Sequence, residues 1–161
     1  MRNAVVVLAA VWFGCGGKAP TADHPAAPPT ALGTTGYPGL DWGATAATVR
    51  AIYPNASATN DGHLALRGTD EGQPNLTTFE FVAGRLGKIS IVFDRRFASM
   101  KQCGAVWTTL RAAFDPKLGN SAGENLAAFW ESATYAVTLS CDLDDAERAG
   151  LSMSYAPAPP T

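Results

Sequence analysis

The reactive side chains of this 161-residue chain include three cysteines and two histidines. Nucleophilic catalysis needs a base held beside a nucleophile. His24 lies in a proline-rich stretch, whereas His63 lies at the start of an expected strand, two residues after Asp61. We interpret His63 as an exposed histidine at a strand end and expect no enzyme activity. A hydrolase that uses His63 is the minor alternative.

Acidic residues gather in two stretches and could in principle offer oxygen ligands to a cation such as calcium. The first stretch holds Asp142, Asp144, Asp145 and Glu147, and the second holds Asp70 and Glu71. The first stretch lacks the turn glycine and the bidentate acid of an EF-hand loop. We therefore interpret both stretches as solvated loops between strands, and we expect neither a metal ion nor a cofactor.

Cys15 follows a ten-residue apolar run, residues 4–13, which Arg2 precedes. The run is too short to cross a bilayer as a helix and is typical of a signal peptide. Gly14 and Cys15 resemble the end of the lipobox of bacterial lipoproteins, although Trp12 and Phe13 depart from it. The resemblance implies a signal peptide at residues 1–14 and acyl chains on Cys15, with the outer membrane favoured over the inner. Simple secretion and a retained apolar anchor remain the alternatives.

The composition divides the rest of the chain. Residues 15–38 are rich in proline, alanine and threonine, so we expect an extended tether. Residues 157–161 form a proline-rich tail that we expect to be disordered. Residues 39–156 are long enough for a single domain with one core. A net charge of -2 with 16% charged residues gives no electrostatic case for binding nucleic acid.

Within that domain, apolar spacing predicts two helices and six strands. Thr45 caps a short helix at residues 46–53, and Ser99 with Gln102 forms a capping box for a second helix that ends near Pro116. Period-two alternation predicts strands within residues 62–67, 77–83, 86–93, 126–130, 134–141 and 150–155. The order helix, three strands, helix, three strands predicts an α+β fold made of two repeats, with both helices on one face of an antiparallel sheet. A ferredoxin-like arrangement with one strand fewer is the alternative.

The remaining cysteines, Cys103 and Cys141, lie on faces that should meet. Cys103 is on the apolar stripe of the second helix, and Cys141 is on the apolar face of the strand that the helix should cover. An extracytoplasmic location favours a disulfide between them. Two buried free thiols are the alternative.

The pattern of the folded part, with its short helix, aromatic hairpin and late tryptophan-containing hairpin, resembles small envelope lipoproteins. In architecture it is similar to the β-lactamase-inhibitor-protein-like fold and to outer-membrane assembly lipoproteins of the BamE type. The resemblance implies a non-catalytic domain that binds another envelope protein. A small-ligand or lipid-binding periplasmic domain is the alternative.

Three tryptophans, Trp42, Trp107 and Trp130, are candidates for a binding surface. Trp107 falls on the apolar stripe of the second helix, so we expect it in the core. Phe129 and Trp130 are neighbours in a strand and must point to opposite faces of the sheet. We therefore take Phe129 and Trp130 as the candidate partner surface, with one of the two rings directed outward.

Overall fold

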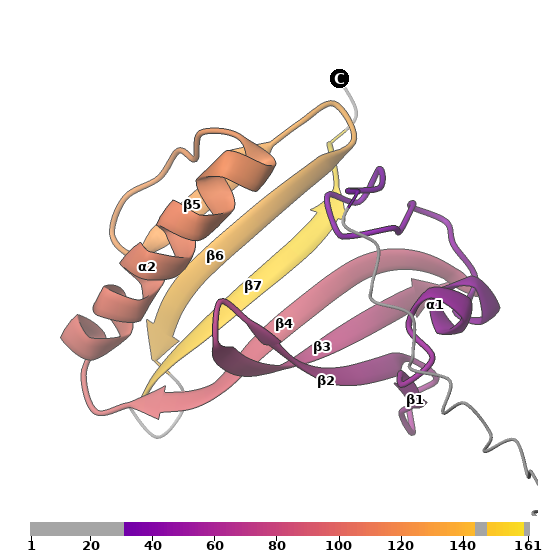
Figure 1. The fold of residues 1–161 in the computed structure, drawn as a ribbon, viewed down its shortest axis with the longest axis horizontal. Coiled ribbons are helices and arrows are strands. Elements are labelled where there is room, and N and C mark those ends of the chain that lie inside the picture. The colour runs from indigo at the N-terminus through magenta and orange to yellow at the C-terminus, as the bar shows by residue number, and fades with distance from the viewer. Residues whose placement is uncertain (1–30, 144–147, 160–161) are drawn as a thin grey trace, which may run out of the picture.

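The computed structural model describes residues 31–143 and 148–159 (Figure 1). One antiparallel sheet of seven strands, in the order β1-β2-β3-β4-β7-β6-β5, carries helix α2 across one face. The helices are α1 (Ala46–Ile52) and α2 (Met100–Leu118). The strands are β1 (Ser57–Ala58), β2 (Leu64–Asp70), β3 (Gln73–Val82), β4 (Arg85–Phe97), β5 (Ala127–Glu131), β6 (Tyr135–Leu143) and β7 (Ala149–Pro157). The predicted α+β class with an antiparallel sheet is confirmed.

Both helices begin where their caps predict. The side chain of Thr45 accepts a hydrogen bond from the Thr48 N–H at the start of α1, and Ser99 accepts one from the Gln102 N–H at the start of α2. Helix α2 runs through Pro116, where we expected it to stop. Its buried stripe continues to Leu118, so packing against the sheet outweighs the hydrogen bond that proline cannot make.

The β2–β3 connection is shorter than predicted. We expected residues 68–75 to be a long loop, but β2 and β3 pair through Asp70 and Gln73 and leave a two-residue turn, Glu71-Gly72. Both turn residues have positive φ, which suits a tight hairpin. The added β1 and the longer strands make the sheet wider and longer than the six predicted runs.

The strand register collects the apolar side chains on one face, which we call the core face. One continuous cross-strand row on this face contains Leu64, Phe79, Ile89, Tyr155, Val137 and Trp130. All six are buried. Helix α2 covers the β6–β7 side of this face, and Tyr53, at the end of α1, stacks on Phe79 of β3. Burial of this row is the main hydrophobic stabilisation of the sheet.

The opposite face, which we call the open face, carries mostly short side chains, alanine, serine and threonine, with a few larger ones. One row contains Ala65, Thr78, Ser90, Ser154, Thr138 and Phe129. The next row contains Arg67, Leu76, Val92, Ser152, Ser140 and Ala127. The four central strands therefore place six hydroxyl groups side by side on a surface without a covering helix in the described part of the chain.

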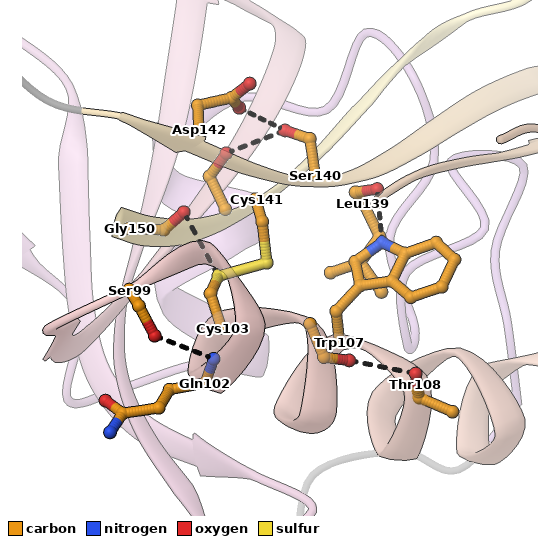
Figure 2. The surroundings of a disulfide bond; sticks show 12 residues. Ser99, Gln102, Cys103, Trp107, Thr108, Leu139, Ser140, Cys141, Asp142 and Gly150 are labelled. Atoms are coloured by element: carbon orange, nitrogen blue, oxygen red, sulfur yellow. Dashed lines mark hydrogen bonds between the residues drawn. A yellow bond between two sulfur atoms is a disulfide. The ribbon is translucent and has the colours of Figure 1, made fainter. Parts of the chain in front are cut away.

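The disulfide Cys103–Cys141 joins the first turns of α2 to β6, with 6.2 Å between the two Cα atoms (Figure 2). Close by, the Trp107 indole N–H donates to the Leu139 carbonyl at 3.1 Å. The predicted pairing is confirmed. Closure of a loop of 38 residues by this bond contributes about 4 kcal/mol in the chain-entropy model.

The folded part extends beyond the predicted domain at both ends. Residues 31–38, which we assigned to the tether, form a closed loop in which Thr35 is fully buried. At the other end, β7 continues to Pro157, and the Ala158 N–H donates to the Thr134 carbonyl. The composition of residues 31–38, with two glycines, two threonines and a proline, concealed this packing, because a threonine that satisfies its hydroxyl internally can be buried.

The two predicted repeats are unequal in the structure. Each half has a helix followed by a three-strand meander, but α1 has 7 residues and α2 has 19, and the first half also contains β1. Within residues 31–143 and 148–159, no helix is long and apolar enough to cross a membrane. Residues 1–30, which include Cys15 and the predicted signal peptide, lie outside the described residues.

Candidate functional site

His63 has a structural role in the β1–β2 turn. Its Nδ1 accepts a hydrogen bond from the Phe81 N–H at 3.2 Å, so this nitrogen is engaged with the neighbouring strand. Its Nε2 lies 3.9 Å from Asp61 Oδ2. The nearby hydroxyl of Thr59 donates to Asp61 rather than to His63, and this bond lowers the pKa of Asp61. The arrangement therefore holds a turn together, and it lacks the nucleophile-to-base hydrogen bond of a catalytic dyad.

A serine signature that the sequence interpretation passed over lies after α2. Residues 119–123 spell Gly-Asn-Ser-Ala-Gly, which matches the Gly-x-Ser-x-Gly pattern of hydrolase nucleophiles. That pattern is informative at a sharp turn from a strand into a helix, but here it follows a helix and leads into β5. The Ser121 hydroxyl accepts a hydrogen bond from Arg111 Nε at 2.6 Å. A cationic donor does not activate a hydroxyl as a nucleophile, so Ser121 fastens this loop to α2.

The acidic stretches differ from one another. Residues 144–147, and hence Asp144, Asp145 and Glu147, lie outside the described residues, while Asp142 is exposed and accepts from the Ser140 hydroxyl. Among the described residues, no group of three histidine, cysteine or acidic side chains could hold a metal ion. Asp70 is not in a solvated loop as predicted, since it ends β2 and is half-buried.

The two neighbouring aromatics of β5 point to opposite faces, as the alternation requires. Trp130 is 1% exposed and its indole donates to Asp115 Oδ1 at 2.9 Å, so it belongs to the core and cannot form part of a partner surface. Phe129 is 43% exposed at the end of the first open-face row. Of the predicted pair, Phe129 alone is available to a partner.

Four charged side chains of the open face form two ion pairs. Lys88 lies 3.1 Å from Glu80, and Arg67 lies 3.1 Å from Asp94. The hydroxyl of Ser90 also donates to Glu80 at 2.5 Å. Although partial burial opposes it, these bonds lower the pKa of Glu80. These two ion pairs carry no net charge, and the exposed acids Glu131 and Asp142 lie at the β5–β6 side of the same face.

A cleft on the core side is the second candidate site. It lies where the loop of residues 31–41, the β2–β3 hairpin, the last turns of α2 and the end of β7 meet. Its cavity volume is about 100 Å³. The lining residues are Leu32, Gly36, Tyr37, Pro38, Asp70, Phe114, Lys117, Leu118 and Tyr155. The cleft therefore combines aromatic and aliphatic walls with one acid and one base.

The loop of residues 31–41 is folded so that it presents Tyr37 to the cleft. The Thr35 hydroxyl donates to the Leu40 carbonyl at 2.8 Å and accepts from the Tyr37 N–H at 3.0 Å. Gly33 is required at its position, because a Cβ there would lie 1.8 Å from the Leu40 carbonyl oxygen. The Tyr37 ring contacts the rings of Tyr53, Phe79 and Tyr155 at centroid distances of 5.5 to 5.8 Å. Burial raises the pKa of Tyr37 to about 12, so the phenol stays neutral.

Asp70 forms the acidic wall of the cleft. Its Oδ2 accepts a hydrogen bond from the Asn75 side-chain amide at 2.8 Å, and the Thr77 hydroxyl lies 3.4 Å from the Asn75 carbonyl oxygen. Asn75 and Thr77 are both 2% exposed, so this polar relay lies on the core face. Burial raises the pKa of Asp70, although the Asn75 amide and the Lys117 charge oppose the effect. The fold therefore keeps a carboxylate at a position that disfavours its charge.

Lys117 lies at the mouth of the cleft. Its ammonium lies 2.6 Å from Glu71 Oε1 and 5.2 Å from the centre of the Phe114 ring. Asp70 and Glu71 are consecutive, so two carboxylates face one lysine here. The local charge of these three groups is −1 when all are ionised.

Comparison of the chain with protein-family models, curated proteins and solved structures gives no match. The candidate sites are therefore argued from this chain alone. The open face could have been found in the sequence as the polar half of each alternating strand. The cleft could not, because it joins residues 32 to 155 through the register of the sheet, and because the Asp70-Glu71 pair was assigned to a loop.

Proposed function

We propose that this chain is an extracytoplasmic lipoprotein, anchored to a bacterial membrane through acylated Cys15, whose non-catalytic domain binds another envelope protein. The observation that carries the binding proposal is the open face, where a sheet of seven strands presents neutral hydroxyl rows beside the exposed Phe129. The disulfide supports the compartment, because such bonds persist in oxidising environments and are rare in the cytosol.

The chemistry of the open face specifies the partner. Neighbouring strands are about 4.8 Å apart and alternate residues about 6.8 Å apart, so the hydroxyls form two adjacent rows of donors and acceptors on the twisted sheet. The four charges of the two ion pairs at its border are already paired within the chain. A fitting partner presents a largely neutral surface of backbone or hydroxyl groups, with an apolar contact for Phe129. We expect such a complex to be little affected by salt, since it does not depend on exposed charge pairs.

Site-specific photo-crosslinking in cells tests this surface. We place a photoreactive residue at Thr138 or Ser154 on the open face, and at Thr109 on the exposed side of α2 as the matched control. We expect one protein adduct of the same mass from both open-face positions and none from Thr109. A Thr78→Arg substitution should abolish the adducts, whereas Thr109→Arg should leave them unchanged.

Two results would contradict the proposal for the open face. One is an adduct that forms equally from Thr109 and from the open-face positions. The other is the absence of any adduct from Thr138 and Ser154 while the protein is folded and at its normal level.

The anchor is tested separately. Cys15→Ala should move the protein from the membrane to the soluble fraction, because each buried methylene of an acyl chain contributes about 0.8 kcal/mol to membrane binding. Mass spectrometry of the unmodified chain should show acyl groups on Cys15. If the Cys15→Ala protein stays with the membrane, the lipid assignment is wrong.

The cleft favours a second candidate function, the binding of a small ligand. It combines apolar walls with a few polar groups, as small-molecule sites do, and its volume of about 100 Å³ limits the enclosed part of a ligand to a small group. In this case the domain would be a periplasmic ligand-binding module. The two functions use opposite faces of the sheet, so one protein can perform both.

The order of the elements also supports the duplication that the sequence predicts, which we keep as a proposal. The sheet order places the meander β2-β3-β4 beside the meander β7-β6-β5, and the last strands of the two meanders pair with each other. This is the arrangement that a two-fold axis between β4 and β7 would generate. Related sequences in which the two halves align with each other would test the proposal.

A further inference from the structure

We propose that the cleft binds the head group of an organic cation, an ammonium with methyl or alkyl substituents, between the Asp70 carboxylate and the rings of Tyr37, Phe114 and Tyr155. The proposal rests on ligand binding at the cleft and names the chemical class of the ligand. It is independent of the partner proposed for the open face.

The first argument is the combination of acid and aromatic rings around one cavity. Tyr37, Phe114 and Tyr155 line the same cleft as Asp70. Aromatic rings attract cations through their quadrupole, and cages of such rings are known to recognise quaternary ammonium groups. The carboxylate adds a full negative charge to these partial ones. A neutral apolar group would gain from the walls but not from Asp70.

The second argument is that the chain already places a cation in this environment. The Lys117 ammonium lies over the Phe114 ring at 5.2 Å and contacts Glu71 at 2.6 Å. This lysine satisfies Glu71, which is half exposed at the mouth, and it only partly offsets the charge of the deeper Asp70. An additional cation next to Asp70 would bring the charge of the three groups and the ligand to zero. A ligand with one negative charge would instead bring the net charge of the three groups and the ligand to −2.

The third argument is the unfavourable position of Asp70 in the protein as it stands. The Asn75 side-chain amide donates a hydrogen bond to Asp70. An asparagine at residue 70 could accept the same hydrogen bond through its side-chain carbonyl oxygen. A charged group retained where its environment penalises the charge is a candidate for function rather than for stability. A bound cation would remove the penalty.

The size of the cleft limits the ligand. An apolar cavity of about 150 Å³ holds one benzene molecule, so about 100 Å³ accommodates a group of four to five heavy atoms. A trimethylammonium group has four. The cleft therefore holds the head group, and the remainder of the ligand extends past Lys117 and Leu32 into solvent.

The test uses two probes that differ in charge but not in shape, choline and its neutral carbon analogue 3,3-dimethylbutan-1-ol. We measure binding to the full chain by isothermal titration calorimetry and follow the resonances of Tyr37 and Phe114 by NMR. We expect choline to bind at least tenfold more tightly than the neutral analogue. Asp70→Asn should abolish that preference, and Lys117→Gln should preserve or increase it. Asp94→Asn, the same change of charge on the open face, should alter it less than twofold.

The outcomes separate the inference from the proposal on which it rests. Equal binding of the two probes would overturn the inference that the ligand is a cation, and it would leave the cleft as a site for apolar ligands. Binding of neither probe, with no shift of the Tyr37 or Phe114 resonances, would overturn both. An unchanged preference for choline in a folded Asp70→Asn protein would also overturn the role of Asp70.

Discussion

The two ends of helix α2 are held to the sheet in different ways. The first turns are bonded covalently through Cys103 and by the Trp107 indole, both to β6 (Figure 2). The last turns contain Pro116, border the cleft through Phe114 and Leu118, and reach the β2–β3 hairpin through the exposed Lys117–Glu71 ion pair. The same helix thus has one end joined covalently to the sheet and another end that borders the cleft.

The difference shows how a small domain can carry a binding cleft without losing its core. Trp107 and Leu110 are buried against the sheet in the turns that precede the cleft. Proline removes a hydrogen bond from the final turn, whereas the disulfide fixes the first turns to β6. Stability and the proposed binding therefore depend largely on different residues of one element, and substitutions should separate them.

The largest expected effect is at the fixed end. Trp107→Ala removes a buried indole and its hydrogen bond to Leu139, so we expect a loss of about 3 to 5 kcal/mol in the free energy of unfolding. Urea denaturation followed by circular dichroism measures it. Thr109→Ala, on the exposed side of the same helix, is the control and should change stability by less than about 0.5 kcal/mol. A small loss of stability for Trp107→Ala would show that the first turns of α2 are not the part of the helix that holds it to the sheet.

The disulfide is expected to contribute slightly less. Replacing both Cys103 and Cys141 by alanine should lower the free energy of unfolding by about 2 to 4 kcal/mol, because the unfolded chain regains the entropy of an open loop. Hydrogen exchange should rise in the first turns of α2 and in β6 before it rises in the β2–β3 hairpin. Cys15→Ala should leave the stability of the domain unchanged. Uniform exchange across the whole chain would contradict the contrast between the two ends.

Asp115 should have an intermediate effect. It accepts hydrogen bonds from the Trp130 indole and from the Ser121 N–H, and these bonds lower its pKa although burial alone would raise it. Asp115→Ala should destabilise by about 1 to 3 kcal/mol, since the buried indole loses its acceptor. Because the pKa is depressed on folding, this stability is present above pH 3.8 and is lost as the pH falls through the folded value. A double-mutant cycle with Trp130→Phe, which removes the indole N–H, gives the coupling energy of the Asp115–Trp130 hydrogen bond.

At the open end, removal of the ion pair should have little effect. Lys117→Ala breaks an exposed pair with Glu71, and such pairs contribute about 0.2 to 1 kcal/mol. Thermal unfolding in low and high salt should show a difference between the proteins that shrinks as salt is added. A loss as large as that for Trp107→Ala would mean that the ion pair holds the cleft end as firmly as the first turns are held.

The smallest expected effect has the opposite sign. The pKa of Asp70 is raised in the folded protein, so its protonated form favours folding, and stability is lost as the pH rises from 3.8 through the folded value. Asp70→Asn should therefore be slightly more stable than the original chain at neutral pH and equal to it below pH 3.8. A lower stability of Asp70→Asn at neutral pH would show that the carboxylate is structural.

The sequence was sufficient for what depends on local periodicity. The alternation of Ile89, Ile91 and Phe93 marks a strand with one buried face, and Ser99 marks the start of α2 because its cap is satisfied within one turn. The Cys103–Cys141 pairing also followed, since each cysteine lies on the apolar face of its own element.

What escaped prediction depends on contacts distant in sequence. Pro116 remains in a helix because Leu118 is buried beyond it, and Thr35 is buried because the Leu40 carbonyl accepts its hydroxyl proton. Asp70 was assigned to solvent because the strand that continues through it is revealed only by pairing with Gln73. The cleft arises from all three of these features and was therefore not visible in the pattern of residue types.

The carbonyl of Thr134 accepts hydrogen bonds from both the Trp42 indole, at 2.8 Å, and the Ala158 N–H, at 3.2 Å. The segment that leads into α1 and the end of β7 therefore meet at the β5–β6 turn. Domains of this kind tolerate circular permutation and insertion into a host protein. A short linker could join residue 158 to residue 31, with new chain ends placed in the exposed β1–β2 turn. This permutation would keep the sheet intact and would move the N-terminus, where a membrane anchor could be attached, to that turn.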